Sequence, residues 1–330
     1  MPTQNAVNTK TPRVLLLRFG GLGDLLAVLP AISYLRKTMP DGEFTLVCRE
    51  EYGGLFQDAG LVDRLVPAGG RRAAALFGGL SGADPETRRW AGGFSLAVAW
   101  MQKPPDPSLE EGLRSMGVPE VRVIALPSLP AVTISRFYFD STVSIIPGAG
   151  VNAPGFDECA RLPKSERSVA SARGLRSRIG GGQGPFAVIH SGSGGESKRW
   201  PLANFLEIVR RLADRGMPGV LVTGDAEERP SFSGPLEEGG LPPGWTWLRR
   251  PALSGLAALL AEASFYLGND SGVTHLATAC GTKVLALFRE DLEPAWRPFG
   301  RTRVLAAGTL LEISADSVWL ALREENIFLE

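Results

Sequence analysis

The stretch LGNDSGVTHLATACGTKVLALF, residues 267–288, decides how the chain folds. Two apolar runs typical of buried strands, residues 265–268 and 284–288, flank a segment with the composition of a helix. The expected helix opens with Asp270, Ser271 and Gly272, residue types that are favoured at helix N-termini. Strand, turn, helix and strand in this order are the repeating unit of a parallel α/β sheet.

The start of this helix is also a candidate anion site. The first turn of a helix leaves backbone N–H groups unpaired and carries the positive end of the helix dipole, so a phosphate group fits there. His275 follows Gly272 by three residues, a spacing that places both on the side facing that end. A plain helix cap without a ligand is the alternative, and other stretches have to decide between the two.

Length and composition indicate a globular chain with two domains. A chain of 330 residues is longer than one domain usually is. Hydrophobic residues make up 44% of it and charged residues 21%, which is typical of a soluble protein. Lys and Arg together number 35, as do Asp and Glu, so no overall positive charge attracts nucleic acid. An anionic ligand has to be held locally.

The cysteines and the chain start indicate the compartment. Cys48, Cys159 and Cys280 are odd in number and scattered, so they predict neither a disulfide framework nor a metal site. Residues 1–12 contain no apolar signal core, and no apolar run approaches the roughly 18 residues that cross a bilayer. We therefore expect a cytoplasmic protein that is neither secreted by that route nor membrane-spanning.

Two series of alternating strands and helices predict an α/β fold with two doubly wound, Rossmann-like domains facing a central cleft. The glycine run at 179–185 is the best linker, so we expect domains at 1–178 and 179–330, and we allow the last helix to pack back on the first domain. Residues 69–89 are assigned only as helix or loop, and residues 127–160 show no clear period. The expected strands lie at residues 13–19, 44–48, 63–67, 94–100, 121–126, 186–190, 219–224, 245–250, 265–268 and 284–288.

The turn GGLGD, residues 20–24, follows the first expected strand. Gly20, Gly21 and Gly23 allow a sharp strand-to-helix turn and a close approach of a ligand or a facing domain. The third glycine of the dinucleotide fingerprint is absent. Asp24 is either an ordinary acid in the first helical turn or a carboxylate on the cleft rim that takes a proton from an attacking hydroxyl.

Two further polar loops follow strands and so reach the same cleft. The loop SGSGGESKRWP, residues 191–201, contains Ser193 and Lys198, and Lys198 supplies a point charge suited to phosphate. The loop TGDAEE, residues 223–228, places Glu227 and Glu228 where a carboxylate accepts hydrogen bonds from ribose hydroxyls. Solvated surface charges are the alternative for all three charged residues.

Several chemistries are not indicated. His190 and His275 are the only histidines, and neither has a partner at metal-ligand spacing, so we expect no structural zinc. No GxSxG elbow or P-loop signature occurs, which argues against common hydrolases and kinases.

Together these motifs resemble the heptosyltransferases of glycosyltransferase family 9, which build the inner core of lipopolysaccharide. Their order and spacing follow the family across most of the chain, whereas residues 69–160 give no match. The matching strings are RFGGLGDLLAVLPAI, SGSGGESKRWP, TGDAEER, NDSGVTHLATACGT followed by ALF, and WRPFG at 296–300.

The resemblance implies a bacterial enzyme of GT-B fold that transfers heptose from ADP-heptose with inversion, without a cofactor or an essential metal. It matches Asp24 with the catalytic base and Lys198 with the lysine that contacts the diphosphate. Glu228, or else Glu227, matches the glutamate that binds the ribose. The remaining donor-binding residues that it implies are Ser193, Asp270, Ser271, Gly272 and His275.

The chain departs from the family at three positions: His190 stands where Pro is usual, Lys283 where Pro follows GT, and Arg289 where Gly follows LF. We expect Lys283 and Arg289 to add charge near the donor site and to affect which sugar nucleotide is accepted. A sugar-nucleotide epimerase of similar fold and a nucleotide-binding relative without catalysis are the alternatives.

The resemblance also implies a lipid-linked glycan acceptor, whose sugar the sequence does not name. We therefore expect peripheral contact with the inner face of the inner membrane. Four arginines flank an apolar segment that could meet anionic head groups, with a solvated basic surface as the alternative: Arg71, Arg72, Arg88 and Arg89.

Overall fold

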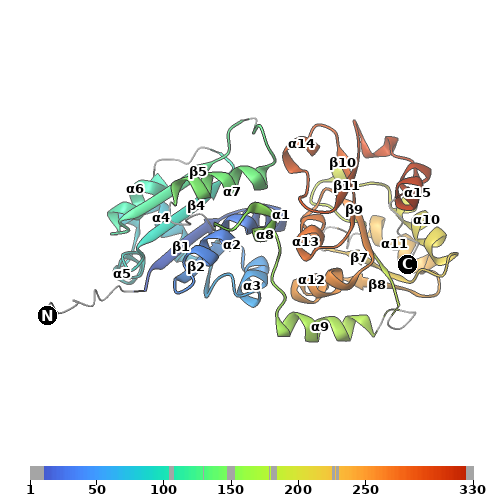
Figure 1. The fold of residues 1–330 in the computed structure, drawn as a ribbon, viewed down its shortest axis with the longest axis horizontal. Coiled ribbons are helices and arrows are strands. Elements are labelled where there is room, and N and C mark those ends of the chain that lie inside the picture. Colours follow the sequence, from blue (N-terminus) through green and yellow to red (C-terminus); the bar gives the residue numbers. More distant parts are fainter. Residues whose placement is uncertain are drawn as a thin grey trace.

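The structure, a computed structural model, describes residues 11–103, 108–128, 130–146, 153–177, 179, 184–224, 227 and 230–324. This part of the chain forms two α/β halves that lie side by side along the long axis of the molecule (Figure 1). Each half is built on one parallel sheet, which confirms the predicted fold class.

The first sheet has the strand order β3-β2-β1-β4-β5, with every neighbouring pair parallel. Its strands are β1 (Arg13–Arg18), β2 (Glu43–Cys48), β3 (Arg64–Pro67), β4 (Leu96–Met101) and β5 (Glu120–Ala125). Its helices are α1 (Leu22–Ala27), α2 (Leu29–Thr38), α3 (Glu50–Asp58), α4 (Arg71–Gly82), α5 (Pro85–Ala91), α6 (Ser108–Ser115), α7 (Ile134–Ile145) and α8 (Phe156–Cys159).

Helices cover both faces of this sheet. Successive side chains of a strand point to opposite faces, so the continuous apolar run of β1 serves two cores. Val14 and Leu16 pack with α1, α2 and α7, whereas Leu15 and Leu17 pack with α4 and α6.

The second sheet has the order β11-β10-β9-β6-β7-β8 and is parallel throughout. Its strands are β6 (Ala187–His190), β7 (Gly219–Thr223), β8 (Trp245–Arg249), β9 (Phe265–Asn269), β10 (Val284–Arg289) and β11 (Thr302–Ala307). The helices with it are α9 (Glu166–Arg176), η1 (Glu196–Lys198), α10 (Leu202–Ala213), α11 (Pro230–Gly239), α12 (Leu253–Glu262), α13 (Gly272–Cys280), α14 (Glu293–Trp296), η3 (Leu310–Glu312) and α15 (Ala315–Glu324).

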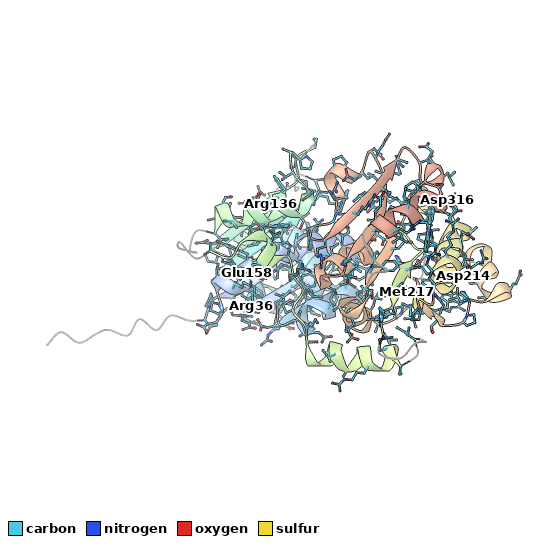
Figure 2. All side chains as sticks on the ribbon, turned by 45° about the vertical axis from the view of Figure 1, so that its right-hand side comes forward. Arg36, Arg136, Glu158, Asp214, Met217 and Asp316 are labelled. Carbon is cyan, nitrogen blue, oxygen red and sulfur yellow. The ribbon has the colours of Figure 1, made fainter. Side chains whose placement is uncertain are left out.

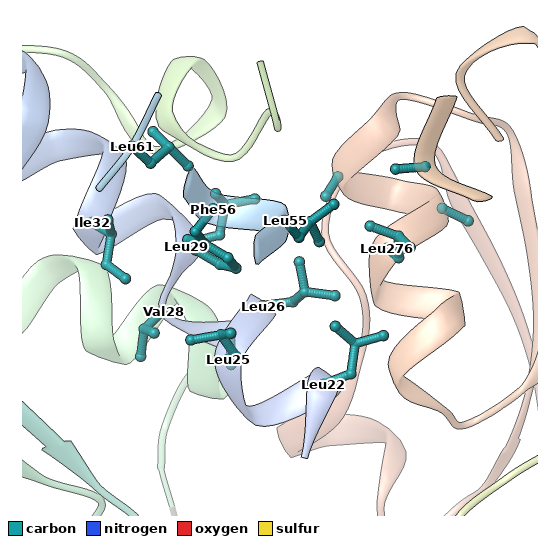
Figure 3. Close-up of a cluster of buried hydrophobic side chains, with 14 of the residues drawn as sticks. Leu22, Leu25, Leu26, Val28, Leu29, Ile32, Leu55, Phe56, Leu61 and Leu276 are labelled. Carbon is teal, nitrogen blue, oxygen red and sulfur yellow. The ribbon is translucent and has the colours of Figure 1, made fainter. Parts of the chain in front are cut away.

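The two halves share a hydrophobic core. Leu22 and Leu26 of α1 and Leu55 of α3 point toward α13, which carries Leu276 (Figure 3). Helix α3 also contacts α12. Apolar area buried between the halves contributes to stability in the same way as area buried within one domain, so the halves support each other.

The predicted domain boundary at residue 178 lies too late. Helix α8 packs on α2 of the first half, but the backbone N–H of Leu162 already donates to the carbonyl of Ala279 in α13, at 2.9 Å. Helix α9 packs on α12, so it belongs to the second half. Most of the glycine run at 179–185 lies outside the described residues.

The last described helix does not return to the first domain. Helix α15 packs on α10 in the core of the second half. Asp316 of α15, labelled in Figure 2, forms an ion pair of 2.7 Å with Arg211 of α10. Apolar residues at helical spacing explain this position, because Val318, Ala321 and Leu322 form one buried face.

Other elements differ from the sequence prediction. The helix expected after GGLGD is two helices, because Pro30 has no N–H to continue the hydrogen-bond pattern and the chain turns at Val28. Helices α6, α7 and α11 and strand β11 lie where no element was assigned. Within the described residues, no helix combines the length and the apolar character that crossing a membrane requires.

Candidate active site

Each sheet reverses its strand order at one point, and both reversals border one cleft. The first reversal lies between β1 and β4, and the second lies between β6 and β9. Open α/β sheets bind ligands beyond the carboxyl ends of their strands at such points. The cleft has a volume of about 1180 Å³, which is large enough to hold a nucleotide sugar. Residues of both halves line it.

The lining from the first half comes from three loops that follow strands. Residues 21–24 follow β1, Arg49, Glu51 and Tyr52 follow β2, and Gln102 follows β4. The second half contributes the ends of β6 and β7, the residues that follow β8 and β9, the loop with Ser193 and Lys198, and the start of α13. Trp296 of the WRPFG string also lines it.

Asp24 is the third residue of α1, and its carboxylate is held by three donors. Oδ2 accepts the backbone N–H of Gly21 at 2.8 Å, the helix-capping contact expected of an acid at this position. Oδ1 accepts Nη2 of Arg18 at 2.9 Å and also Nε2 of Gln102. The side chain is 17% exposed, so Asp24 is both a capping acid and a carboxylate that reaches the cleft.

The sequence interpretation missed Arg18, which anchors Asp24. Its side chain is 1% exposed and lies over the ring of Tyr138 at 5.1 Å. The guanidinium also donates to the carbonyls of Asp24 and Trp100 and to the hydroxyl of Tyr138. A charged residue that ends an otherwise apolar strand is rarely buried without a partner. The charged Arg18 at the end of an apolar run was therefore the sequence signal for a buried ion pair.

The glycines of the GGLGD turn allow this close packing. Gly20 has φ +115°, and a Cβ on it would lie 2.4 Å from Oδ2 of Asp24. Where α1 meets the start of α13, here called the cleft floor, a Cβ on Gly272 would lie 2.7 Å from Cβ of Leu22 and 2.9 Å from the backbone N of Gly23. Only glycines let α1 and α13 touch here, which brings Asp24 toward the helix start that the sequence indicated as an anion site.

At that helix start, Asp270 connects the other predicted donor-site residues. Its Oδ2 lies 2.7 Å from Nζ of Lys198, and its carbonyl accepts the hydroxyl of Ser193 at 2.8 Å. Ser271 is the N-cap of α13 and accepts the backbone N–H of Thr274. The structure thus brings Ser193, Lys198, Asp270, Ser271 and Gly272 together.

Both histidines lie at this end of the sheet. Burial lowers the pKa of His190 to about 4, and its Nδ1 lies 3.3 Å from the hydroxyl of Ser271. Burial also lowers the pKa of His275, with the charges of Asp270 and Asp24 acting in the opposite direction. Both rings are therefore neutral at pH 7, and His275 packs edge-on against Trp296 with centroids 6.1 Å apart.

Glu227 lines the cleft but is 3% exposed. Its Oε2 accepts the backbone N–H of Gly224 at 2.9 Å, and Oε1 lies 3.8 Å from Nε of Arg199. Oε1 has no hydrogen-bond partner among the described residues. Glu228 lies outside the described residues, so the structure does not compare the two glutamates.

The two charged departures lie differently from the expectation. Lys283 precedes β10 and is therefore at the amino edge of the sheet, away from the cleft. Arg289 ends β10 but is held by both carboxylate oxygens of Asp291, at 3.0 and 2.8 Å, and does not line the cleft. Arg289 also donates from Nη1 to the hydroxyl of Ser197, the residue before Lys198, at 3.4 Å.

No group of three or more His, Cys, Asp or Glu side chains in the described ranges is arranged to hold a metal ion. Three positively charged side chains line the cleft, those of Arg49, Lys198 and Arg250.

These features define the GT-B class of glycosyltransferases. Two parallel Rossmann-like halves meet at a cleft that borders both strand-order reversals. One half supplies a carboxylate, and the other supplies a helix N-terminus with a lysine. The model of glycosyltransferase family 9 (heptosyltransferase) matches residues 146–312, just over half of the chain. The chain belongs to this family.

Individual relatives agree with the family. Lipopolysaccharide heptosyltransferase 1 of Pseudomonas aeruginosa is 26% identical over 314 residues, which cover 88% of this chain and 82% of that protein. A glycosyl transferase family 9 structure from Veillonella parvula superposes with a TM-score of 0.75 at 17% identity, covering 96% of this chain and 97% of that one. The heptosyltransferase WaaC of E. coli with ADP gives 0.64 at 18% identity, covering 94% and 99%. These likenesses support the GT-B fold.

Proposed function

We propose that this protein transfers heptose from ADP-heptose to an acceptor of the lipopolysaccharide inner-core type, with inversion at the anomeric carbon. The observation that carries the proposal is the meeting of α1 and α13, which puts Asp24 and the Lys198–Asp270–Ser271 site in one cleft. This arrangement places a base on one side of the sugar and a site for the leaving diphosphate on the other. It suits a single displacement at the anomeric carbon.

In this reaction an acceptor hydroxyl oxygen forms a bond to the anomeric carbon as the bond from that carbon to the diphosphate oxygen breaks. The hydroxyl proton goes to Asp24, and ADP leaves with the bond electrons. A carboxylate has about four acceptor sites. Arg18, Gln102 and Gly21 occupy three at Asp24, which leaves one for the acceptor hydroxyl.

The departing diphosphate gains negative charge as the bond breaks. The N–H groups at the start of α13 and the ammonium of Lys198 stabilise that charge. We therefore propose transfer without an essential metal or a cofactor. The buried carboxylate of Glu227, or Glu228 beside it in the sequence, is the proposed ribose ligand.

The acceptor belongs on the side of the cleft formed by the first half. Arg49, Tyr52 and Gln102 line it there, at the carboxyl ends of β2 and β4. Two relatives support the proposed reaction rather than this location. One is named lipopolysaccharide heptosyltransferase 1, and the other is a heptosyltransferase whose structure is named as a complex with ADP.

Peripheral binding to the cytoplasmic membrane face is part of the proposal. Helix α4 carries Phe77, which is 37% exposed, and four arginines on α4 and α5 are also exposed: Arg71, Arg72, Arg88 and Arg89. Arg72 forms an ion pair of 2.5 Å with Glu86, which reduces its share of the positive field of the four arginines. Co-sedimentation with anionic and neutral vesicles tests this, and equal binding to both would remove the electrostatic part.

The function is tested by incubating the protein with ADP-heptose and a lipid A–Kdo acceptor and analysing both products. Transfer of heptose with release of ADP supports the proposal. A changed sugar nucleotide without transfer would indicate an epimerase, and ADP binding without either reaction would indicate a non-catalytic relative.

A further inference from the structure

Arg250, directly after β8, has an unusual backbone conformation. Among the described residues it is the single non-glycine residue with a positive φ, at 43°. An L side chain in this left-handed region crowds its own backbone, and the strain persists only where the surroundings impose it. Such residues gather at ligand sites, so the observed strain is a reason to look for a function.

The surroundings that hold Arg250 are the neighbouring strand and the following proline. Its backbone N–H donates to the carbonyl of Thr223 at the end of β7, at 2.9 Å, and Pro251 fixes the chain that leads into α12. The side chain is exposed and lines the cleft. The strained turn therefore places a guanidinium group on the cleft wall rather than inside the protein.

The cleft lining near Arg250 includes several apolar side chains beside the polar Thr223, whose carbonyl accepts the Arg250 backbone N–H. Val222 and Leu256, both 2% exposed, lie at the end of β7 and in α12. A flat heteroaromatic ring has apolar faces and fits such a surface. The apolar residues that line this part of the cleft are Val222, Pro251, Ala252, Leu253 and Leu256.

The distance from the candidate phosphate site suits a nucleobase. The order β9-β6-β7-β8 puts the start of α13 over the β9–β6 boundary and Arg250 beside β7 and β8. Two strand spacings of about 4.8 Å separate these places, or roughly 10 Å. An extended nucleoside diphosphate spans such a distance from its phosphates to its base.

We propose that Arg250 is a nucleobase-binding residue whose guanidinium stacks on the purine of the bound nucleotide, held in position by the left-handed backbone. Arg is suited to this contact because its guanidinium is planar and packs on aromatic faces. The inference rests on the proposed function, since it names how that site recognises the base of its donor. Glycine at 250 would remove the strain and also the contact.

The test compares ADP with inorganic pyrophosphate, which has the phosphates but no base. Binding is measured by calorimetry, with pyrophosphate titrated in competition with ADP. In Arg250→Gly we expect the Kd for ADP to rise about 5- to 10-fold, while the Kd for pyrophosphate stays within about two-fold. The melting temperature should stay level or rise, because glycine adopts positive φ without strain.

Two further variants separate the causes. Arg250→Asn keeps a residue that tolerates positive φ and should lose ADP affinity as Arg250→Gly does, which excludes loop flexibility as the cause. Arg250→Lys keeps the charge without the planar group and should also bind ADP weakly. Full ADP affinity in the lysine variant, unchanged affinity in the glycine variant, or equal losses for ADP and pyrophosphate would each overturn the stacking.

The outcome for the wild type keeps this inference apart from the function it rests on. If the wild-type protein binds neither ADP nor pyrophosphate, the donor assignment fails and the role of Arg250 falls with it. If the wild type binds ADP and only the variants behave differently from expectation, the stacking alone is wrong.

Discussion

Nζ of Lys198 lies 2.7 Å from Oδ2 of Asp270, so the lysine proposed to hold the donor diphosphate is already paired with a carboxylate. The carboxylate is 6% exposed and Lys198 is 32% exposed, so the pair sits at the edge between protein and cleft. A diphosphate and a carboxylate repel each other. If the diphosphate binds at Lys198 as proposed, it has to share Lys198 with Asp270 or draw it away. We therefore expect Asp270 to tune how strongly Lys198 acts on the ligand.

Lys198→Ala should weaken ADP binding by about 1 to 3 kcal/mol, the scale of one charge-assisted contact. Asp270→Asn should bind ADP at least as tightly as the wild type, because it removes a negative charge and releases Lys198. Calorimetric titration of both variants measures this difference. If Asp270→Asn loses as much affinity as Lys198→Ala, Asp270 contacts the ligand directly and the tuning role is wrong.

Asp24→Asn should reduce turnover by about 100-fold or more, since a positioned general base contributes typically 100- to 10,000-fold. ADP affinity should stay within about three-fold, because the proposed diphosphate site is formed by residues of the other half of the protein. Mass spectrometry of the products measures turnover, and calorimetric titration with ADP measures affinity. Near-normal turnover would reduce Asp24 to a capping residue.

The same substitution has a structural side that needs a control. Arg18 is buried, and Asp24 is the one carboxylate that pairs with it among the described residues. Asn keeps an acceptor for Arg18 but removes the counter-charge, and breaking a buried pair can cost about 3 to 5 kcal/mol. The melting temperature of Asp24→Asn therefore has to be measured, and turnover compared well below it.

Gly272→Ala should destabilise the protein by about 1 to 3 kcal/mol, the usual cost of overpacking. The added methyl would meet the backbone of Gly23 at 2.9 Å, and backbone cannot move aside as a side chain tip can. Gly194→Ala is the matched control, because a Cβ there meets nothing within 4 Å. Urea unfolding of both variants checks the prediction, and equal stabilities would contradict it.

Stability should fall as the pH drops from about 6.5 to about 4, the ordinary and the lowered pKa of His190. In this window the unfolded chain binds a proton at His190 that the folded chain does not, so protons favour unfolding. The full effect of this residue is about 3 kcal/mol, and it is complete below the lower pKa.

His190→Asn cannot titrate, so its urea midpoint should change less between pH 7 and pH 4.5 than that of the wild type. His275, whose pKa burial also lowers, remains in both proteins and contributes equally. Parallel pH profiles for variant and wild type would show that His190 is not the titrating group.

The regular parts of this fold could be predicted because apolar runs and glycine turns are local signals. Every expected strand from residue 13 to residue 288 exists, and the site motifs after β1, β6 and β9 lie at the strand ends. Strand β11 and helices α6 and α7 were missed. None of the three has a continuous run of large apolar residues like the VLLL of β1, and packing on neighbours decides their structure.

Contacts between distant residues could not be predicted in this way. Nothing local to Arg18 shows that Trp100 and Tyr138 will receive it, since these lie 82 and 120 residues away. The conformation of Arg250 depends likewise on Thr223 in the neighbouring strand. Sequence motifs locate the loops of the site, whereas the partners that orient its side chains emerge from the fold.

The tight meeting of Leu22 and Gly272 has a mechanical consequence. With no space for even one methyl group between α1 and α13, the two halves cannot slide past each other at the cleft floor. The contact therefore acts as a fixed spacer between the halves. Backbone atoms, and not side-chain rotamers, set how far Asp24 in α1 lies from Ser271 at the start of α13.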